Sequence, residues 1–404
     1  MNHKCRVSAG VGVLVVVLVM FAATAALAEP LKISVIADMS GPYAGITASN
    51  VEAAKMAIAD FGGKALGEPI EFIYRDHMCK PDVANQKAKE LYEKELVDVI
   101  FDVPNSAAGL AVSNQAKLHK KLFFSVGSGT TRHSGPDCNL YTFDWAYNDY
   151  MLATAVGLWA AENLGKKWFT ITADYAWGHD LLKHFSDALK AKGGTLLGNE
   201  MVALGASDFS QYILKAMNAN PEVLVLLNAG KDGVNSTKQA VEFGLKKKAK
   251  IVHALLFIDD IKAAGDIFAD DYVTGAWYWK SDNPGSKEFV EKWKAKFKRP
   301  PNWMNAATYS AVTQYLKAVE RAKSKDALAV IKALEGHEFR DLLANPGKIR
   351  AEDHMQVGNA YILRVKKPNE VKEEWDYFEI VGVIPPDKAY QDPKDTGCKM
   401  DRSQ

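Results

Sequence analysis

Downstream of an apolar N-terminal segment, strand-like and helix-like stretches alternate regularly, and this alternation constrains the fold more than any other feature of the chain. The apolar run at 31–36 predicts a buried strand, and residues 49–61 place Val51, Ala54 and Ile58 at helical spacing. Later segments repeat this pattern, and each crossover is long enough for a parallel βαβ unit. The sequence therefore predicts an α/β fold in which helices cover parallel sheets.

The alternation runs through the chain twice. The first run predicts strands near 31–36, 70–74, 97–101 and 122–125, with helices near 49–61, 83–93 and 105–119. After a junction near 140–147, the second run predicts helices near 148–163, 179–192, 209–218 and 234–244, with strands near 168–173, 195–203 and 223–227. Two doubly wound α/β lobes follow from this pattern, with a hinge and an interlobe ligand cleft at the carboxyl ends of the strands.

The remaining segments are expected to complete both lobes rather than to start a third. They comprise strands near 250–255 and 272–279, helices near 286–297, 303–323 and 326–335, and short strands near 347–350, 359–366 and 373–381. We expect an N-terminal lobe of residues 29–144 plus about 280–345, a C-terminal lobe of 145–279 plus about 346–385, and a tail at 386–404.

The first 28 residues carry the pattern of a secretory signal peptide. Lys4 and Arg6 precede an apolar run, and an A-x-A cleavage site ends at Ala28. An uncleaved membrane anchor is the alternative, but the run is shorter than the roughly 20 apolar residues that a span needs. Cys5 precedes the run, which argues against a lipid-anchored cysteine. We expect export to the periplasm and cleavage near Ala28.

The overall charge and composition exclude several classes of partner. The chain has a formal net charge of +1 and 48% hydrophobic residues. A near-neutral charge gives no electrostatic reason to expect nucleic acid or an anionic membrane surface as partner. With 404 residues, the chain can bury a large core and is expected to divide into about two domains.

Three cysteines remain after the predicted cleavage, so an oxidising compartment would pair two of them. We favour Cys138 with Cys398, because the polar tail around Cys398 has little reason to be ordered without a tether. Cys79 with Cys138 is the alternative pairing, and Cys79 can also be a buried free thiol. The spacings are too wide for a zinc site, and no CxxC motif occurs.

Enzyme motifs are absent from the sequence. It has no P-loop, GxGxxG, HExxH or GxSxG motif. Gly127-Ser128-Gly129 is therefore interpreted as a turn that makes room for a ligand. A soft-metal site at His77 and Cys79 is disfavoured, because residues that follow a strand directly face alternate sides. We expect no catalytic residue, no metal and no cofactor.

The loops that leave the predicted strands are rich in residues suited to a ligand. They hold Tyr43 after the first strand, and Asn105 and Ser106 before a helix. In the second run, Tyr175 and Trp177 follow a strand. The N–H groups at a helix N-terminus suit a carboxylate, and aromatic rings suit a flat or apolar ligand body. Asn105 and Ser106 can also cap the helix, which is compatible with binding.

Three stretches carry a resemblance to a known family. They are Ser-Gly-Pro-Tyr-Ala-Gly at 40–45 with its following helix, Tyr-Ala-Trp-Gly at 175–178, and the run from Trp277 to Tyr309. From about 31 to 377 the chain resembles the leucine/isoleucine/valine-binding family of type I periplasmic solute-binding proteins, the receptors of ABC importers. The resemblance implies two lobes that close on a ligand like a hinged trap.

The resemblance also implies roles for individual residues. Ser106 and the backbone of Ala107 and Ser128 would hold the ligand carboxylate. An acid near 149, either Asp149 or, with a shifted alignment, Asn148 in its place, and a second acid at Asp259 would face an ammonium group. Two departures, Gly129 where the family often has Thr and Trp177 where it often has Tyr, weaken an amino-acid ligand. The full set of expected binding residues is Tyr43, Asn105, Ser106, Ala107, Ser128, Gly129, Asp149, Tyr175, Trp177, Asn228 and Asp259.

The expected function is that of an extracytoplasmic receptor of an ABC importer, not an enzyme. It would trap a small carboxylate, which is an aromatic or other organic acid or a branched-chain amino acid, and Trp177 favours a ligand that is not an amino acid. Its partner would be an ABC permease in the inner membrane, and we expect a monomer. A ligand-sensing module for a membrane receptor is the alternative, and an exported enzyme is less favoured.

Overall fold

The computed structural model describes Met1 and residues 29–403. Apart from Met1, the predicted signal peptide lies outside these residues. Within the described part of the chain, no helix combines the length and the apolar character needed to cross a membrane.

The first sheet has six strands in the order β2-β3-β1-β4-β5-β6. All neighbouring strands are parallel except β2 and β3. Runs of apolar and aromatic residues make β4 and β5 fully buried, as expected for parallel strands covered on both faces. The strands are β1 (Leu31–Ala37), β2 (Lys64–Ala65), β3 (Glu68–Asp76), β4 (Val99–Asp102), β5 (Leu122–Ser125) and β6 (Thr142–Asp144).

The second sheet has seven strands in the order β16-β15-β11-β10-β9-β7-β8. Strands β7 to β11 are parallel, whereas β15 and β16 are added antiparallel at one edge. The strands are β7 (Lys167–Ala173), β8 (Thr195–Val202), β9 (Val223–Leu227), β10 (Lys250–His253), β11 (Tyr272–Gly275), β15 (Ala360–Val365) and β16 (Phe378–Ile384). The structure is thus an α/β fold with two sheets, as predicted from the sequence.

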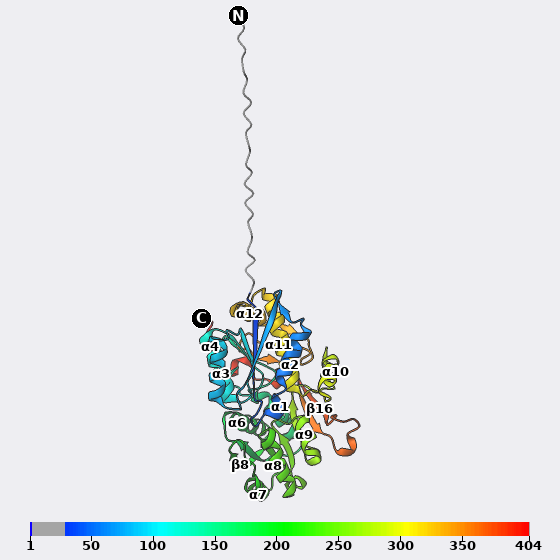
Figure 1. Ribbon diagram of the computed structural model, residues 1–404. Coiled ribbons are helices and arrows are strands. Elements are labelled where there is room, and N and C mark those ends of the chain that lie inside the picture. Colours follow the sequence, from blue (N-terminus) through cyan, green and yellow to red (C-terminus); the bar gives the residue numbers. More distant parts are fainter. Residues whose placement is uncertain (2–28, 404) are drawn as a thin grey trace.

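Helices separate the strands of both sheets. In Figure 1, α2, α3, α4 and α11 lie in the upper half, and α6, α7, α8 and α9 in the lower half. The helices are α1 (Ala44–Thr47), α2 (Asn50–Asp60), α3 (Pro81–Glu93), α4 (Ser106–His119), α5 (Asp149–Asn163), α6 (Ala176–Ala191), α7 (Ser210–Ala219), α8 (Gly230–Glu242), α9 (Ile258–Ala264), α10 (Ser286–Phe297), α11 (Trp303–Ala322), α12 (Ala327–Leu334) and α13 (Pro386–Ala389).

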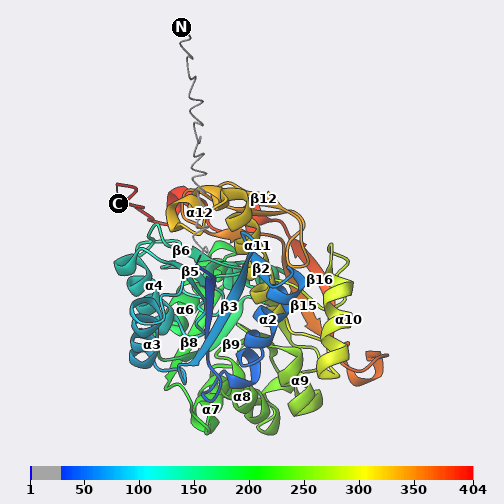
Figure 2. The same ribbon diagram turned by 45° about the horizontal axis from the view of Figure 1, so that its top comes forward.

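The chain passes between the two sheets more than once. The first passage runs from β6 into α5, and the later return brings α11 back against α2. The chain then reaches β15 and β16, which lie beside α10 in Figure 2. A third, small sheet of β12 (Glu338–Phe339), β13 (Gly347–Ile349) and β14 (Gln356–Val357) lies between these segments in sequence, and Met355 forms a bridge to Asp144 of β6. The exact lobe boundaries stay a prediction.

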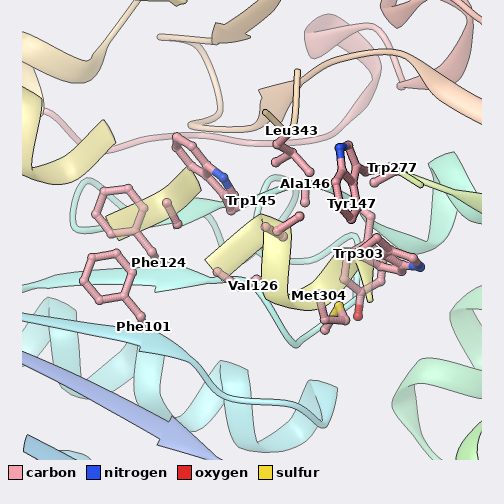
Figure 3. Packing of buried hydrophobic residues seen from close by; sticks show 14 of the residues in the cluster. Phe101, Phe124, Val126, Trp145, Ala146, Tyr147, Trp277, Trp303, Met304 and Leu343 are labelled. Carbon is pink, nitrogen blue, oxygen red and sulfur yellow. The ribbon is translucent and has the colours of Figure 1, made fainter. Parts of the chain in front are cut away.

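The main hydrophobic core is continuous from the first sheet to the interlobe region. Phe101 stacks on Phe124 with ring centroids 5.0 Å apart, and Phe124 in turn meets Trp145. Further along, Tyr147 meets Trp303 edge to face at 5.0 Å. Figure 3 shows these side chains together, from Phe101 at one end to Trp303 at the other. The aromatic residues of the first interlobe passage therefore pack in the core.

A disulfide joins Cys138 to Cys398 across 260 residues of sequence. This is the favoured one of the predicted pairings, and it fixes the C-terminal tail beside the segment that follows β5. Cys79 is a buried free thiol, as the remaining possibility for this residue allowed.

Candidate ligand pocket

The loops that leave the strands of both sheets enclose a pocket with about 370 Å³ of empty space. This volume falls within the usual range of roughly 300–1,000 Å³ for small-molecule sites. None of the lining residues, all within the described part of the chain, carries an acidic or basic side chain. The pocket is lined by Tyr43, Ile46, Thr47, Pro104, Asn105, Ser106, Gly127, Gly129, Tyr147, Tyr175, Trp177, Ala229, Leu255, Phe257 and Met304.

The N-terminus of α4 forms one polar corner of this pocket. Asn105 caps the helix, because its side-chain oxygen accepts a hydrogen bond from the N–H of Ala108 at 3.0 Å. The cap is held from behind by Cys79, whose sulfur accepts from the Asn105 amide at 3.5 Å. Ser106 is 1% exposed, and its hydroxyl has no hydrogen-bond partner among the described residues. A free hydroxyl beside the first N–H groups of a helix is suited to an anion.

The turn after β5 brings the backbone close to the pocket. A Cβ atom at Gly127 would lie 2.6 Å from the Pro104 nitrogen, and one at Gly129 would lie 2.6 Å from a carboxyl oxygen of Asp149. Both positions therefore need glycine for this close approach. The Tyr147 hydroxyl donates to the Gly127 carbonyl at 3.1 Å and fixes the turn.

Aromatic side chains form most of the remaining wall and connect the two halves. The hydroxyl of Tyr43, after β1, lies 2.6 Å from the hydroxyl of Tyr175, which precedes α6. Nearby, Trp177 lies 6.1 Å from the Tyr175 ring, and Phe257 stacks on Trp303 at 5.3 Å. The wall contributed by the second sheet is therefore mainly apolar and flat.

Six of the eleven residues expected from the sequence line the pocket: Tyr43, Asn105, Ser106, Gly129, Tyr175 and Trp177. Ala107 follows Ser106 in the first turn of α4 but is not among the lining residues. Its proposed role rests on its backbone N–H and stays a prediction.

The polar side chains of Ser128, Asn228 and Asp259 are bonded to other parts of the protein. The Ser128 hydroxyl lies 2.9 Å from a ring nitrogen of His133, and the Asn228 amide donates to Ser236 at 3.1 Å. Asp259 accepts from Arg299 at 2.8 Å and from Asn302 at 3.0 Å. None of the three lines the pocket, so their side chains serve mainly to hold the surrounding loops.

Asp149 lies directly behind Gly129 and outside the lining set. Its carboxyl group is fully buried, and neither oxygen has a hydrogen-bond partner among the described residues. Burial raises its pKa well above the ordinary value, and the charges of Asp180 and Asp144 act in the same direction. The indole N–H of Trp177 lowers this pKa to a smaller extent, but it makes no well-formed hydrogen bond to the carboxyl group.

Several lining residues were not among the expected ones. Phe257 follows β10 directly, which is the same signal that identified Trp177, but the segment was searched for an acid instead. Tyr147 belongs to the aromatic cluster of the first interlobe passage. Met304 gave no signal, because α11 reaches the pocket only through the tertiary fold. The others are small or apolar loop residues: Ile46, Thr47, Pro104, Gly127, Ala229 and Leu255.

Comparisons with known proteins agree with this architecture. The family described as "Periplasmic binding protein" matches residues 30–370. A periplasmic binding protein from Burkholderia mallei is 40% identical with a TM-score of 0.88, and the match covers 92% of this chain and 99% of that one.

Two further solved structures differ in the ligands that their names state. A branched chain amino acid ABC transporter ligand-binding protein from Burkholderia xenovorans LB400 is 33% identical, with a TM-score of 0.81 and coverage of 91% and 99%. A solute binding protein of an ABC transporter from Rhodopseudomonas palustris BisB5, in complex with 3,4-dihydroxy benzoic acid, is 26% identical, with a TM-score of 0.81 and coverage of 88% and 98%.

Proposed function

The chain belongs to the periplasmic binding protein family, and on this basis we propose that its pocket traps a small aromatic carboxylate between the two lobes. It is a solute-binding protein of an ABC transporter, a receptor and not an enzyme. The observation that carries the proposal is the composition of the pocket wall, in which the unpartnered Ser106 hydroxyl is the polar end of an otherwise largely aromatic and apolar site.

The carboxylate is assigned to the N-terminus of α4. Ser106 is buried, and its hydroxyl is free to donate to the ligand. The N–H groups of Ser106 and Ala107 open the helix and have no acceptor within it. Together they supply charge-assisted hydrogen bonds, which are stronger than neutral ones.

The ligand body is assigned to the aromatic wall. Trp177 and Phe257 come from the second sheet, and Tyr43 and Tyr147 from the first half of the chain. An α-amino acid would need an acceptor for its ammonium group, but no lining residue is acidic. Asp259, the second acid expected for that role, is paired with Arg299. The site therefore suits an aromatic acid better than an amino acid.

A branched-chain amino acid is the second candidate, and one observation favours it. Asp149 is an acid without a hydrogen-bond partner among the described residues, and it lies just behind Gly129. The named ligands of the relatives also divide between these two classes.

The cellular setting follows the sequence analysis. We propose that the chain is exported to the periplasm, that it is cleaved near Ala28, and that it acts as a monomer which delivers its ligand to an ABC permease in the inner membrane. The lobes would be 29–144 with about 280–345, and 145–279 with about 346–385, and they would close around the pocket.

A thermal-shift screen of the purified protein tests the ligand class. The panel contains benzoate and cinnamate derivatives, the twenty amino acids and small aliphatic acids. A ligand at about 100 times its dissociation constant adds about 2.7 kcal/mol of stability, which raises the midpoint by a few degrees. A shift with aromatic acids alone supports the proposal. A shift with leucine or valine alone would reject it and assign Asp149 to the ammonium group.

A further inference from the structure

Asp149 is placed where a carboxyl group would ordinarily stabilise a helix, yet it does not cap that helix. It is the first residue of α5, and the cap is formed by Asn148, whose side-chain oxygen accepts from the N–H of Met151 at 3.0 Å. Both carboxyl oxygens of Asp149 remain without a partner among the described residues, although the residue is 0% exposed. Leaving a buried polar group unpaired is costly, so this arrangement calls for a partner from outside the protein.

The backbone directs this carboxyl group toward the pocket. The N–H of Asp149 donates to the Gly129 carbonyl at 2.6 Å, which holds the two residues together. The point that a Cβ atom of Gly129 would occupy is 2.6 Å from Asp149 Oδ1, 2.8 Å from the Tyr147 ring and 2.9 Å from Trp177 Nε1. Gly129, Tyr147 and Trp177 all line the pocket, so the carboxyl group lies at its edge.

The groups that meet at this point define the chemistry that fits there. Asp149 offers a carboxyl oxygen as acceptor, whereas the indole Nε1–H of Trp177 is a donor only. An ammonium group can only donate, so it would face the indole N–H unfavourably. A hydroxyl group can donate to Asp149 and accept from Trp177 at the same time.

We infer that the corner formed by Asp149, Trp177 and Gly129 binds a hydroxyl group of the ligand. The inference rests on the proposed function and narrows the ligand class to hydroxylated aromatic carboxylates. Ser106 and α4 hold the carboxylate, the aromatic wall holds the ring, and Asp149 with Trp177 selects for the hydroxyl. Asp149 is then a specificity residue.

Isothermal titration calorimetry on the purified protein tests this with matched probes. The probes are benzoate and its three monohydroxy derivatives, so that each pair differs by one hydroxyl group. At least one hydroxybenzoate is expected to bind about tenfold or more tightly than benzoate, which is the discrimination expected from hydrogen bonds to a hydroxyl. Asp149→Leu is expected to remove this preference while changing benzoate affinity by about threefold or less. Asp149→Asn, which can still bond a hydroxyl, is expected to retain part of it.

Two further variants keep the test decisive. Trp177→Phe keeps a ring but removes the indole N–H, and it is expected to reduce the preference even if Asp149→Leu does not fold. Asp174→Asn alters an exposed acid beside Tyr175 that is bonded to His179, and it is expected to leave the preference unchanged.

The outcomes separate this inference from the proposed function. Equal binding of benzoate and all hydroxybenzoates by the wild-type protein would overturn the hydroxyl site and leave the aromatic carboxylate site standing. Equal weakening of every probe by Asp149→Leu would likewise overturn it, because it would make Asp149 a purely structural residue. If no aromatic acid binds the wild-type protein, both proposals are rejected.

Discussion

The two walls of the pocket differ in chemistry, although both are built from loops that follow parallel strands. The wall from the first sheet presents a helix N-terminus, the free Ser106 hydroxyl and the turn at Gly127 and Gly129. The wall from the second sheet presents Tyr175, Trp177, Ala229, Leu255 and Phe257.

This difference suggests a division of labour between the walls. Directional hydrogen bonds need a preformed arrangement of donors, and α4 supplies one without help from the second sheet. Apolar contact needs only enclosure, which the second wall supplies when the lobes are together. We therefore expect the first wall to anchor the ligand and the second wall to add affinity on closure. Three variants test this comparison.

The largest expected effect comes from the anchoring wall. Ser106→Ala removes a hydrogen bond to the ligand carboxylate, which is worth about 1.5–3 kcal/mol, so affinity should fall about 10- to 100-fold. The midpoint of the ligand-free protein should hardly change, because the hydroxyl has no partner among the described residues. Calorimetry and thermal unfolding measure the two quantities.

Ser113→Ala on the same helix is the matched control for Ser106→Ala. The Ser113 hydroxyl is bonded to Thr142 at 2.9 Å and accepts from Asn139 at 2.8 Å, away from the pocket. Its loss should lower stability and leave affinity unchanged. If Ser106→Ala behaved like this control, the carboxylate would not lie at α4.

A smaller effect is expected from the covering wall. Trp177→Leu removes an aromatic contact worth about 0.5–1.5 kcal/mol beyond its buried area, so the affinity for an aromatic acid should fall about tenfold or less. The affinity for aliphatic acids should change less. Trp159→Leu, whose ring packs on Tyr272 at 5.0 Å outside the pocket, should affect stability only. Equal loss for aromatic and aliphatic acids would contradict a ring-binding role.

The smallest effect is expected from the contact between the walls. Tyr175→Phe removes the hydroxyl pair with Tyr43, a contact of about 1 kcal/mol, and affinity should fall about fivefold. Tyr43→Phe should give a similar loss, and the double variant should be little worse than either single one, as in a double-mutant cycle. Additive losses would show that the two hydroxyls act separately and not as an interlobe link.

Local features of the sequence explain why much of the architecture could be predicted. The helix that contains Val51, Ala54 and Ile58 and the fully buried strands β4 and β5 are set by periodicity within a few residues. The start of α4 after Asn105 was visible because Asn is a favoured N-cap. Such signals also identified Tyr175 and Trp177, which follow a strand directly.

Other features of the site depend on side chains that are far apart in the sequence. The sequence marked Ser128 and Asp259 as ligand-facing candidates, but His133 and Arg299 occupy their side chains in the structure. Met304 reaches the pocket from α11, long after the other lining residues in the chain. No local pattern reports which polar groups find partners within the protein, because that depends on how the loops meet.

The sequence by itself determined the α/β class, the doubled run of strands and helices, and the helix N-terminus at Ser106, since each depends on spacing between near neighbours. Only the tertiary structure decided which polar groups stay unpaired. Asp149 and Ser106 are left without partners among the described residues, whereas Asp259 and Ser128 are not. The physical reason is that burial makes each polar group seek a partner, and the folded chain supplies partners to some of these groups and leaves others to the ligand.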